Sequence, residues 1–268
     1  MSATVSPLAH VDPHARLEEG VFIGPFCTVG PEVHLGRGTR LENNVTLMGR
    51  VRMGAHNHVY PGAVIGAPPQ DLSYQGAPTE VVIGSHNTIR ECVTIHRGTE
   101  RGQGITRVGD HNLLMACCHV AHDCTVGNHV VVANGTLLGG HVWVEDHAVL
   151  SGNVAVHQFV TVGAYSFVGG VSGVRQDVPP FLLVDGNPAR PKWINAVGLQ
   201  RHGFSRQVIA ALHEAFRLIY RSRTPLEEVQ GVLQSQGHWL PEVQRLVHFL
   251  KGQRQGQHGR ARERRQAA

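Results

Sequence analysis

The chain is poor in aromatic and charged residues, which make up only 6% and 16% of its 268 residues. So low a charge excludes a coiled coil, and a hydrophobic content of 41% excludes an intrinsically disordered chain. No apolar run approaches the roughly 18 residues that a membrane-spanning helix needs. The first twenty residues also lack the basic and apolar segments of a secretory signal. We therefore expect a protein with no integral membrane segment.

Several sequence motifs of covalent catalysis and phosphate binding are missing as well. The five cysteines are odd in number and form no CxxC pair, which argues against a disulfide framework and favours a reducing compartment, the cytoplasm. No GxSxG motif is present, so a covalent acyl-enzyme is not favoured. There is no P-loop, and we interpret the glycine-rich stretch 98–104 as a flexible loop and not as a phosphate cradle.

The net charge of +4 resides in the C-terminal tail, residues 252–268, which contains five arginines and one glutamate. The rest of the chain is formally neutral, so its pI near 9.0 does not indicate a body that binds nucleic acid. With almost no apolar residues, the tail is predicted to be disordered.

Glycine is abundant, with 32 residues. The sequence also contains a repeat in which an aliphatic side chain recurs at every sixth residue. The repeat runs through residues 5–65, returns in the same phase over 83–95, slips by one residue, and continues over 108–174. A period of six fits short strands that turn once per repeat, so three repeats close one triangular rung. Stacked rungs pair at about 4.8 Å. This pattern is typical of a left-handed parallel β-helix, although the period alone does not fix the hand.

The position two residues before each aliphatic residue takes small or medium side chains. Cys27, Cys118 and Cys124 fall on it, so we interpret them as structural filler. After a connector rich in proline and glycine, helical patterns replace the repeat. Ser205 can cap one helix, Thr224 with Pro225 at the first position can open a second, and Pro241 can open a third.

The predicted class is therefore mainly β, a parallel β-helix with a small C-terminal helical domain. We place the β-helix at 1–185, with loop insertions near 67–80 and 97–107. The helical domain is placed at 186–251 and the basic tail at 252–268.

Nineteen histidines are present, and one group has a geometric logic. Three repeats to a rung place Val120, Leu138 and Val156 in one column. Four histidines lie beside that column: His119, His122, His141 and His157. Four others show no such grouping and are expected to be solvated surface residues: His34, His56, His58 and His86.

Three interpretations of the histidine group are open. The side chains can be merely exposed on a polar face. They can bind zinc, because neutral imidazole is a favoured ligand. They can also serve acid–base catalysis, with His122 as the base and Asp123 orienting it, because histidine titrates near neutrality.

Several segments resemble one enzyme family, the acyl-[acyl-carrier-protein]–UDP-N-acetylglucosamine O-acyltransferases. The most specific are HVAHDCTVGN, VHQF and GFSRQVIAALHEAFRLIYRS, accompanied by PQDLSYQGAPTEVVIG, IRECVTIHRGT and GGVSGVRQDVPPF. The resemblance covers nearly the whole chain except the basic tail.

This resemblance implies a cytoplasmic homotrimer with active sites between subunits and no cofactor or metal. It implies transfer of a 3-hydroxyacyl chain from acyl carrier protein to the 3-hydroxyl of UDP-N-acetylglucosamine, the first step of lipid A biosynthesis. His122 matches the general base, Asp123 its orienting partner, and Gly140 the residue whose backbone N–H faces the oxyanion. Further positions match substrate-contacting residues: Asp71, His96, His119, His141, His157, Gln158, Asn195 and Arg201.

Three residues on the nucleotide-sugar side depart from the family pattern. Ser73 stands where the family commonly has lysine, Val197 where it has glutamate, and His202 where it has arginine. These changes leave open a 3-amino UDP-sugar acceptor and an amide product, although we expect a UDP-sugar to be retained. Gly170 falls where the family limits acyl length, so we expect a longer 3-hydroxyacyl donor to be preferred over a ten-carbon one.

Two other functions compete with this interpretation. A zinc hydratase of the γ-carbonic-anhydrase type uses the same fold, and HVAHD could supply two of its three histidine ligands. A non-catalytic β-helix, such as a surface-binding scaffold, would show a ladder of threonine or similar residues on one flat face, which the sequence lacks.

Overall fold

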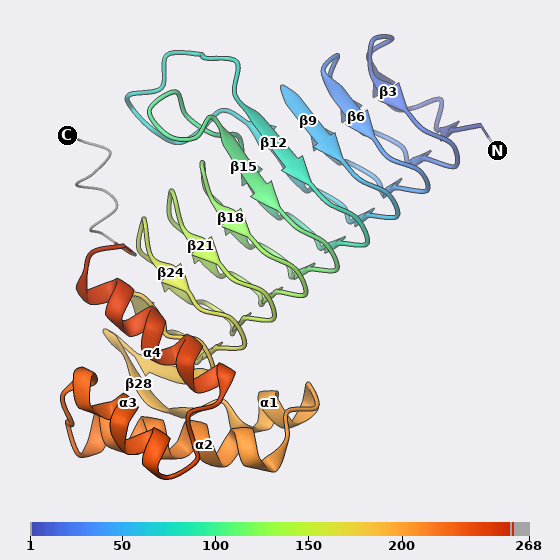
Figure 1. The fold of residues 1–268 in the computed structure, drawn as a ribbon. Coiled ribbons are helices and arrows are strands. Elements are labelled where there is room, and N and C mark those ends of the chain that lie inside the picture. Colours follow the sequence, from blue (N-terminus) through green and yellow to red (C-terminus); the bar gives the residue numbers. More distant parts are fainter. Residues whose placement is uncertain (1, 258, 260–268) are drawn as a thin grey trace.

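The computed structural model describes residues 2–257 and 259. Its larger part is a parallel β-helix, in which short strands stack as rungs and form three sheets, the faces of a triangular prism (Figure 1).

Face A holds eleven strands: β1 (Thr4–Val5), β4 (Phe22–Ile23), β7 (Arg40–Leu41), β10 (His58–Val59), β13 (Thr88–Ile89), β16 (Leu113–Leu114), β19 (Val131–Val132), β22 (Val149–Leu150), β25 (Phe167–Val168), β27 (Leu182–Gly186) and β28 (Ala189–Ile194). Face B holds nine: β2 (His10–Val11), β5 (Thr28–Val29), β8 (Thr46–Leu47), β11 (Val64–Ala67), β14 (Thr94–His96), β17 (His119–Val120), β20 (Leu137–Leu138), β23 (Ala155–Val156) and β26 (Gly173–Val174). Face C holds eight: β3 (Arg16–Leu17), β6 (Val33–Leu35), β9 (Arg50–Met53), β12 (Glu80–Ile83), β15 (Ile105–Val108), β18 (Thr125–Val126), β21 (Trp143–Val144) and β24 (Thr161–Val162).

Rows of turns join the faces, and we name them AB, BC and CA edges after the faces that they connect in chain order. The predicted column of Val120, Leu138 and Val156 is present, because β17 pairs with β20 and β20 with β23 in that register. Two longer connections, 68–79 and 97–104, leave the prism near β12 and β15 (Figure 1).

The two longer connections explain the phase of the repeat. Within an ordinary rung Val120 pairs with Leu138, three repeats later. Across the first connection Met53 pairs with Ile83, an interval longer than an ordinary rung by two whole repeats, so the phase is kept. Across the second, Ile83 pairs with Val108, an interval longer by one whole repeat and one further residue. That extra residue is the slip seen in the sequence.

The repeat positions form the core of the prism. From Ile23 onward every one of them is buried, whereas Val5 at the open N-terminal end is 40% exposed. Cys27, Cys118 and Cys124 are also buried in this core, as predicted for structural filler.

Each edge turns through a residue in the left-handed backbone conformation. Glycine fills this position at Gly20 and Gly38, but histidine, asparagine, aspartate and cysteine fill most of the others. Asp123 (φ 58°) and His141 (φ 61°) occupy it on successive rungs of the BC edge. Short polar side chains tolerate this region better than most, so the edges carry chemistry that a glycine-only turn would lack.

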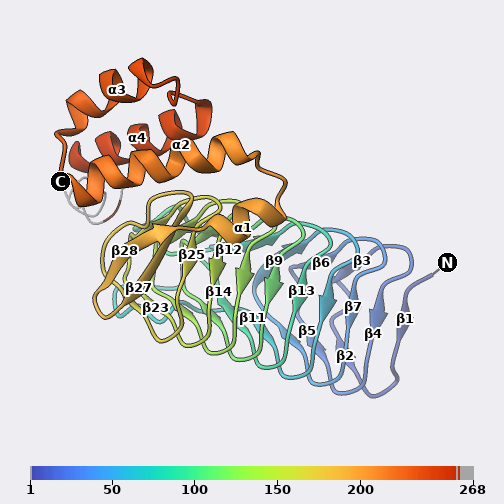
Figure 2. The same ribbon diagram turned by 90° about the horizontal axis from the view of Figure 1, so that it is seen from below.

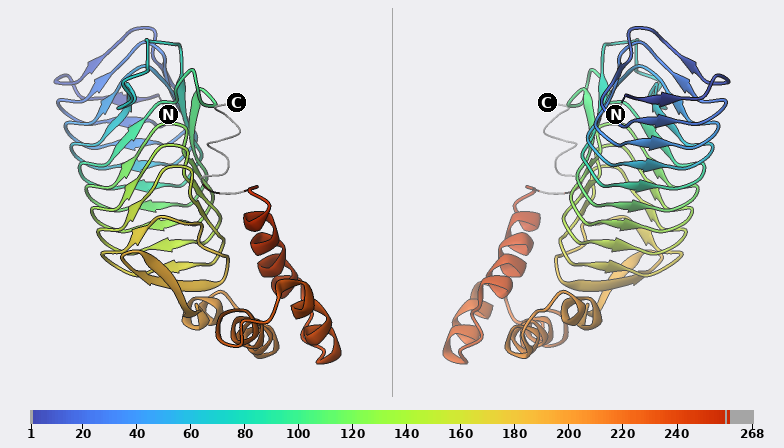
Figure 3. Two further views of the ribbon diagram at one scale, coloured as in Figure 1. Left: turned by 90° about the vertical axis from the view of Figure 1, so that its left-hand side faces the viewer. Right: turned by 90° about the vertical axis from the view of Figure 1, so that its right-hand side faces the viewer.

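The antiparallel strands β27 and β28 close the last rung, and helices follow. These are α1 (Ala196–Arg201), α2 (Arg206–Phe216), the π-helical turn η1 (Arg217–Arg221), α3 (Leu226–Ser235) and α4 (Pro241–Arg254). They lie beside the C-terminal end of the prism, with α3 farther from the rungs than α1 (Figures 2 and 3). Helix α4 contacts the prism through an ion pair between Arg245 and Glu145 at 2.9 Å. No helix among the described residues is long and apolar enough to cross a membrane.

The predicted helix starts are correct in two of three cases. Ser205 caps α2, with its side chain accepting from the Val208 N–H, and Pro241 opens α4. The capping box at Thr224 is wrong: α3 begins at Leu226, Pro225 occupies the cap position, and no side chain caps the helix. The proline cannot be both the cap and the first helical residue, so the helix starts one position later.

The predicted disordered tail is wrong at its first residues, because α4 continues through Arg254. There the Arg254 side chain lies 3.3 Å from a carboxylate oxygen of Glu227. Residues 258 and 260–268 of the tail lie outside the described residues.

Candidate active site

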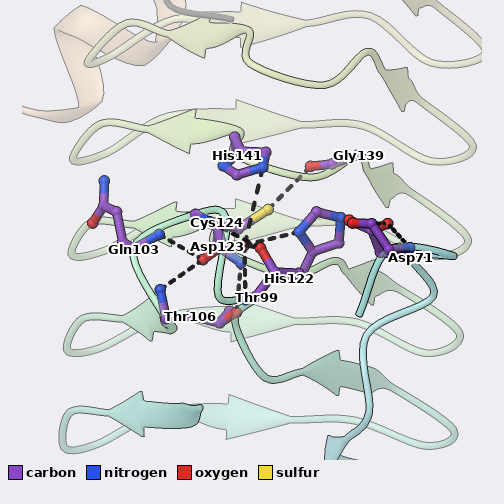
Figure 4. Close-up of polar contacts among 12 residues, drawn as sticks. Asp71, Thr99, Gln103, Thr106, His122, Asp123, Cys124, Gly139 and His141 are labelled. Carbon is purple, nitrogen blue, oxygen red and sulfur yellow. Dashed lines mark hydrogen bonds and ion pairs between the residues drawn. The ribbon is translucent and has the colours of Figure 1, made fainter. Parts of the chain in front are cut away.

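The centre of the site is a buried carboxylate, Asp123, on the BC edge between β17 and β18. Its side chain is 0% exposed. One oxygen accepts hydrogen bonds from the Thr99 backbone N–H at 3.0 Å and the Thr99 hydroxyl at 2.7 Å. The other oxygen accepts from the backbone N–H groups of Gln103, at 2.9 Å, and Gly104, at 3.1 Å (Figure 4). Buried charge is costly unless it is hydrogen-bonded in this way.

The donors come from the connection 97–104, which we interpreted from sequence as a flexible loop. The structure corrects that interpretation, because the loop wraps the Asp123 carboxylate. A Cβ on Gly102 would stand 2.3 Å from the carboxyl carbon, and one on Gly98 would stand 2.1 Å from the Ile105 nitrogen. Only glycine fits at these two positions, because any side chain would collide with Asp123 or with the Ile105 backbone. Sequence reasoning missed Thr99, Gln103 and Gly104 as site residues, although the density of glycine was a signal.

His122 is the partner that Asp123 orients. The His122 Nδ1 lies 2.9 Å from the Asp123 Oδ2. Burial raises the pKa of Asp123, but the hydrogen bonds from His122 and Thr99 outweigh it and hold that pKa below its ordinary value. An ionised carboxylate can only accept hydrogen bonds, so His122 must donate to it and carries a proton on Nδ1. The hydrogen-bond geometry thus leaves Nε2 as the ring nitrogen that faces away from Asp123.

The rung above His122 is shaped to its ring. A Cβ on Gly140 would stand 2.6 Å from both Cε1 and Nε2 of His122, so only glycine fits there. Among the described residues the Gly140 N–H donates to no backbone carbonyl. His141 follows on the same turn, with its Nε2 4.0 Å from the Asp123 carboxylate and its ring stacked on Phe159 at 4.3 Å.

His96 and His119 form a second pair on face B. Their ring centroids lie 4.8 Å apart, edge to face, and the His119 Nδ1 lies 2.7 Å from the Thr94 hydroxyl. Burial, with His96 and His122 close by, lowers the pKa of His119 to about 4, and burial also lowers the pKa of His96. Both rings are therefore neutral near pH 7. The buried Nδ1 of His96 has no hydrogen-bond partner among the described residues.

Asp71 reaches the site from the connection 68–79. Figure 4 shows its carboxylate beside the His122 ring, on the side away from Asp123. The Ser73 backbone N–H and hydroxyl both donate to one Asp71 oxygen at 2.8 Å, and these bonds lower the pKa of Asp71. Ser73, one of the three departures from the family pattern, thus holds Asp71 in place.

Asn195 and Arg201 lie at a different edge. They line a pocket of about 500 Å³ between α1 and face A, together with Val197, His202 and His147. His147 belongs to the CA edge, so one protomer does not bring this pocket to His122 at the BC edge. Asn195 also caps α1, accepting from the Gly198 N–H and donating to the Tyr165 carbonyl.

Three predicted residues have weaker ties to the histidine group. His157 points its Nδ1 at the Gln158 carbonyl, 3.1 Å away, and no ring contact joins it to the other histidines among the described residues. Gln158 is exposed on the same turn. Gly170 is exposed at the AB edge, where an added Cβ would stand 3.4 Å from the Gly152 carbonyl oxygen.

A second histidine column, along the CA edge, corrects the expectation that His56 and His86 show no grouping, although both are exposed as predicted. Five imidazoles stack at ring-centroid distances between 4.8 and 5.2 Å: His56, His86, His111, His129 and His147. Tyr165 continues the stack at 4.6 Å, and His202 packs edge-on against both His147 and Tyr165. We call these five residues the CA ladder.

One group of side chains in the described part of the chain could hold a metal ion: His122, Asp123 and His141, whose ligand atoms lie within 4.8 Å of one another. It is not the set that the zinc-hydratase hypothesis requires, because His119 is absent from it and is bound to Thr94 instead.

Comparisons with known proteins identify the family of this chain. The family described as "Udp N-acetylglucosamine O-acyltransferase; Domain 2" matches residues 177–258, and the bacterial transferase hexapeptide repeat matches 14–49 and 105–140. An acyl-[acyl-carrier-protein]–UDP-N-acetylglucosamine O-acyltransferase of Halorhodospira halophila is 49% identical over 94% of this chain and 98% of its own.

Solved structures lead to the same family. A UDP-N-acetylglucosamine acyltransferase from Bacteroides fragilis superimposes with a TM-score of 0.91 at 38% identity, covering 96% of this chain and 99% of its own. The corresponding protein from Acinetobacter baumannii gives 0.86 at 39%, covering 91% and 95%. The prediction of a left-handed β-helix is thereby confirmed.

Proposed function

This chain belongs to the family of UDP-N-acetylglucosamine O-acyltransferases, and on that premise we propose that it transfers a 3-hydroxyacyl chain from acyl carrier protein to the 3-hydroxyl of UDP-N-acetylglucosamine. The transfer is the acylation that opens lipid A biosynthesis. The observation that carries the proposal is the His122–Asp123 pair, in which a buried carboxylate lies 2.9 Å from the His122 Nδ1. These similarities favour acyl transfer over the competing zinc-hydratase and scaffold functions.

In the proposed mechanism His122 is the general base. Its Nε2 removes the proton from the sugar 3-hydroxyl while that oxygen attacks the thioester carbonyl, so the oxygen–carbon bond forms as the proton moves to nitrogen. Asp123 fixes the tautomer and stabilises the imidazolium that results, as a buried carboxylate partner does in other acyl-transfer sites.

Gly140 supports the next step. Its N–H is unused by the backbone ladder and lies one rung from the His122 ring, where it can donate to the oxyanion of the tetrahedral intermediate. When the intermediate collapses, the carbon–sulfur bond breaks, and the imidazolium returns its proton to the departing thiol of the carrier protein.

The substrate contacts extend outward from this centre. The unpartnered Nδ1 of buried His96 supports a role in substrate binding, because a buried polar atom without a partner is costly. His119, His141 and Asp71 surround the same base, whereas His157 and Gln158 lie farther along the BC edge. We assign Asn195 and Arg201 to the nucleotide side, through their shared pocket.

We further propose a cytoplasmic homotrimer. Asn195 and Arg201 sit at the CA edge of a protomer that carries His122 at its BC edge, so a complete site requires a neighbouring subunit. Mass measurement of the native protein by light scattering tests the oligomer, and a monomer retaining full activity would contradict it.

The acyl donor is proposed to be longer than ten carbons. Gly170 is exposed, with no side chain to block a chain that runs along the AB edge. A competition assay between ten-carbon and longer 3-hydroxyacyl carrier proteins tests this, and equal or faster use of the shorter donor would contradict it.

The experiment for the reaction is a mass-spectrometric transfer assay. Purified protein is mixed with 3-hydroxyacyl carrier proteins and with either UDP-N-acetylglucosamine or its 3-amino analogue. An ester product from the ordinary sugar nucleotide is the expected result. Product from the amino analogue alone would show that Ser73, Val197 and His202 accompany a changed acceptor.

A further inference from the structure

Two cysteines stand apart from the structural role that the repeat gives the others. Cys27, Cys118 and Cys124 are buried, and each donates its thiol hydrogen to a backbone carbonyl. Burial raises the pKa of Cys118 to about 11, which leaves it almost wholly protonated. Cys92 and Cys117 are exposed instead, and the packing of the core does not account for them.

The exposed cysteines occupy equivalent turns of neighbouring rungs on the AB edge. β13 pairs with β16 through Ile89 and Leu114, and β14 pairs with β17 through Thr94 and His119. Both pairings have the same sequence offset, and that offset sets Cys92 directly beside Cys117. Adjacent parallel strands lie about 4.8 Å apart, inside the range of Cα separations that a disulfide spans.

The turn geometry aims one thiol at the other. Cys92 and Cys117 share the left-handed conformation, with φ of 55° and 61°. One rung earlier on the same edge, Gly62 takes that conformation too, and a Cβ on it would stand 3.1 Å from the Cys92 Sγ. Each side chain at this position therefore leans toward the preceding rung. Repetition of this geometry directs the Cys117 Sγ toward the Cys92 Cβ, so rotation about the Cys92 Cα–Cβ bond brings the two sulfurs into bonding reach.

We propose that Cys92 and Cys117 form a vicinal dithiol, a modification site that closes to a disulfide under a mild two-electron oxidant such as hydrogen peroxide. One thiolate attacks the peroxide, the O–O bond breaks, and a sulfenic acid and water result. The second thiol then attacks that sulfur, an S–S bond forms, and a second water leaves. Two S–H bonds are lost, and both electrons reduce the peroxide. A thiol reductant reverses the reaction.

The dithiol adjoins the candidate site without being part of it. Thr94 and His119, which are hydrogen-bonded to each other, come two residues after Cys92 and Cys117 on the same two rungs. The test below reads mass and thiol number only, so its outcome does not depend on the proposed acyltransferase activity.

The experiment uses the full-length native protein, reduced and then treated with hydrogen peroxide. We expect the free thiols, titrated after unfolding, to fall from five to three, with a mass loss of two hydrogens per chain. A tryptic digest is expected to link the peptide that contains Cys92 to the one that contains Cys117. Reduction is expected to restore five thiols.

Matched variants locate the bond. Cys117→Ser and Cys92→Ser are each expected to abolish the mass loss, whereas Cys118→Ala, a change at the adjacent buried position, is expected to preserve it. Three results would overturn the proposal: native thiols that do not react, disulfides that join only separate chains, or a bond that survives Cys117→Ser and is lost in Cys118→Ala.

Discussion

The BC and CA edges each carry stacked histidines, yet only one is built for catalysis. On the CA ladder the rings lie face to face at rung spacing, and the nearest aspartate to His147 in sequence, Asp146, is exposed. On the BC edge His122 and His141 meet at right angles around the buried Asp123 carboxylate. The β-helix supplies the stacking in both places. What distinguishes the BC edge is the buried Asp123 carboxylate, which accepts hydrogen bonds from backbone N–H groups of the loop 97–104.

The sharpest way to break this contrast is to neutralise the carboxylate. Asp123→Asn replaces an acceptor by an amide that no longer fixes the His122 tautomer, so we expect acyl transfer to fall by about 10³-fold, in the range of losses seen when such a partner is removed. Steady-state turnover by mass spectrometry measures it. Asp146→Asn is the matched control beside the CA ladder and is expected to leave the rate unchanged; equal losses in both variants would contradict the contrast.

A smaller effect is expected from disturbing the loop and leaving the carboxylate in place. A Cβ at Gly102 would stand 2.3 Å from the Asp123 carboxyl carbon, so Gly102→Ala must displace the loop or the carboxylate. We expect turnover to drop by about 10-fold to 100-fold, since small misplacements of catalytic groups cost on this order. Gly76→Ala serves as control, because nothing lies within 4 Å of a Cβ there, although its positive φ makes some loss of stability expected. Full activity of Gly102→Ala would show that the loop 97–104 is not needed to position the Asp123 carboxylate.

The buried pair on face B makes stability depend on pH. The pKa of His119 is lowered from 6.5 to about 4, so below pH 6.5 the unfolded chain takes up a proton that the folded chain does not. The free energy of unfolding should therefore fall as the pH drops from 6.5 to 4, by at most about 3 kcal/mol for this residue. Thermal unfolding across that range measures it. His119→Asn should flatten the dependence relative to His14→Asn, on an exposed turn, and an unchanged slope would contradict the assignment.

The smallest effect is expected on the CA ladder itself. His129 stacks between His111 and His147 at 4.9 and 4.8 Å, and asparagine tolerates its left-handed backbone. His129→Asn should lower the melting temperature by about 2–4 °C, the consequence of losing about 1 kcal/mol of ring stacking. Scanning calorimetry measures this. A large loss of activity at unchanged stability would instead give the ladder a role in the reaction.

The difference between the edges also marks what could be predicted from the sequence. The six-residue period specified the core residue by residue, because burial in the prism repeats with the rung. It also placed His119, His122 and His141 together, since these lie within ordinary rungs of three repeats. Part of the CA ladder could have been found in the same way, because His111, His129 and His147 recur at the interval of an ordinary rung. Only the ties of His56 and His86 to the ladder are hidden by the two longer connections. The connection 68–79 separates His56 from His86, and 97–104 separates His86 from His111, so neither interval matches an ordinary rung.

The hydrogen bonds that the loop 97–104 donates to Asp123 could not be derived from the six-residue period. Thr99, Gln103 and Gly104 belong to a loop with no repeat, and they donate to Asp123 from the neighbouring turn of the BC edge. The glycines indicated a loop at this place in the sequence, but they did not indicate that it contacts Asp123. The pocket of Asn195 and Arg201 escaped for a related reason, because α1 reaches it only after the hairpin of β27 and β28 redirects the chain.

The most direct test of the account compares one histidine from each edge. Single-turnover acyl transfer is measured for His122→Asn and His129→Asn under the same conditions, after circular dichroism has shown that both variants are folded. We expect a loss of about 10³-fold or more for the first, because the base is removed. We expect a rate within a factor of about two for the second, because His129 is exposed and does not itself line the pocket of Asn195 and Arg201. A His122→Asn protein that retains a rate close to that of His129→Asn would contradict the claim that the BC edge is the catalytic one.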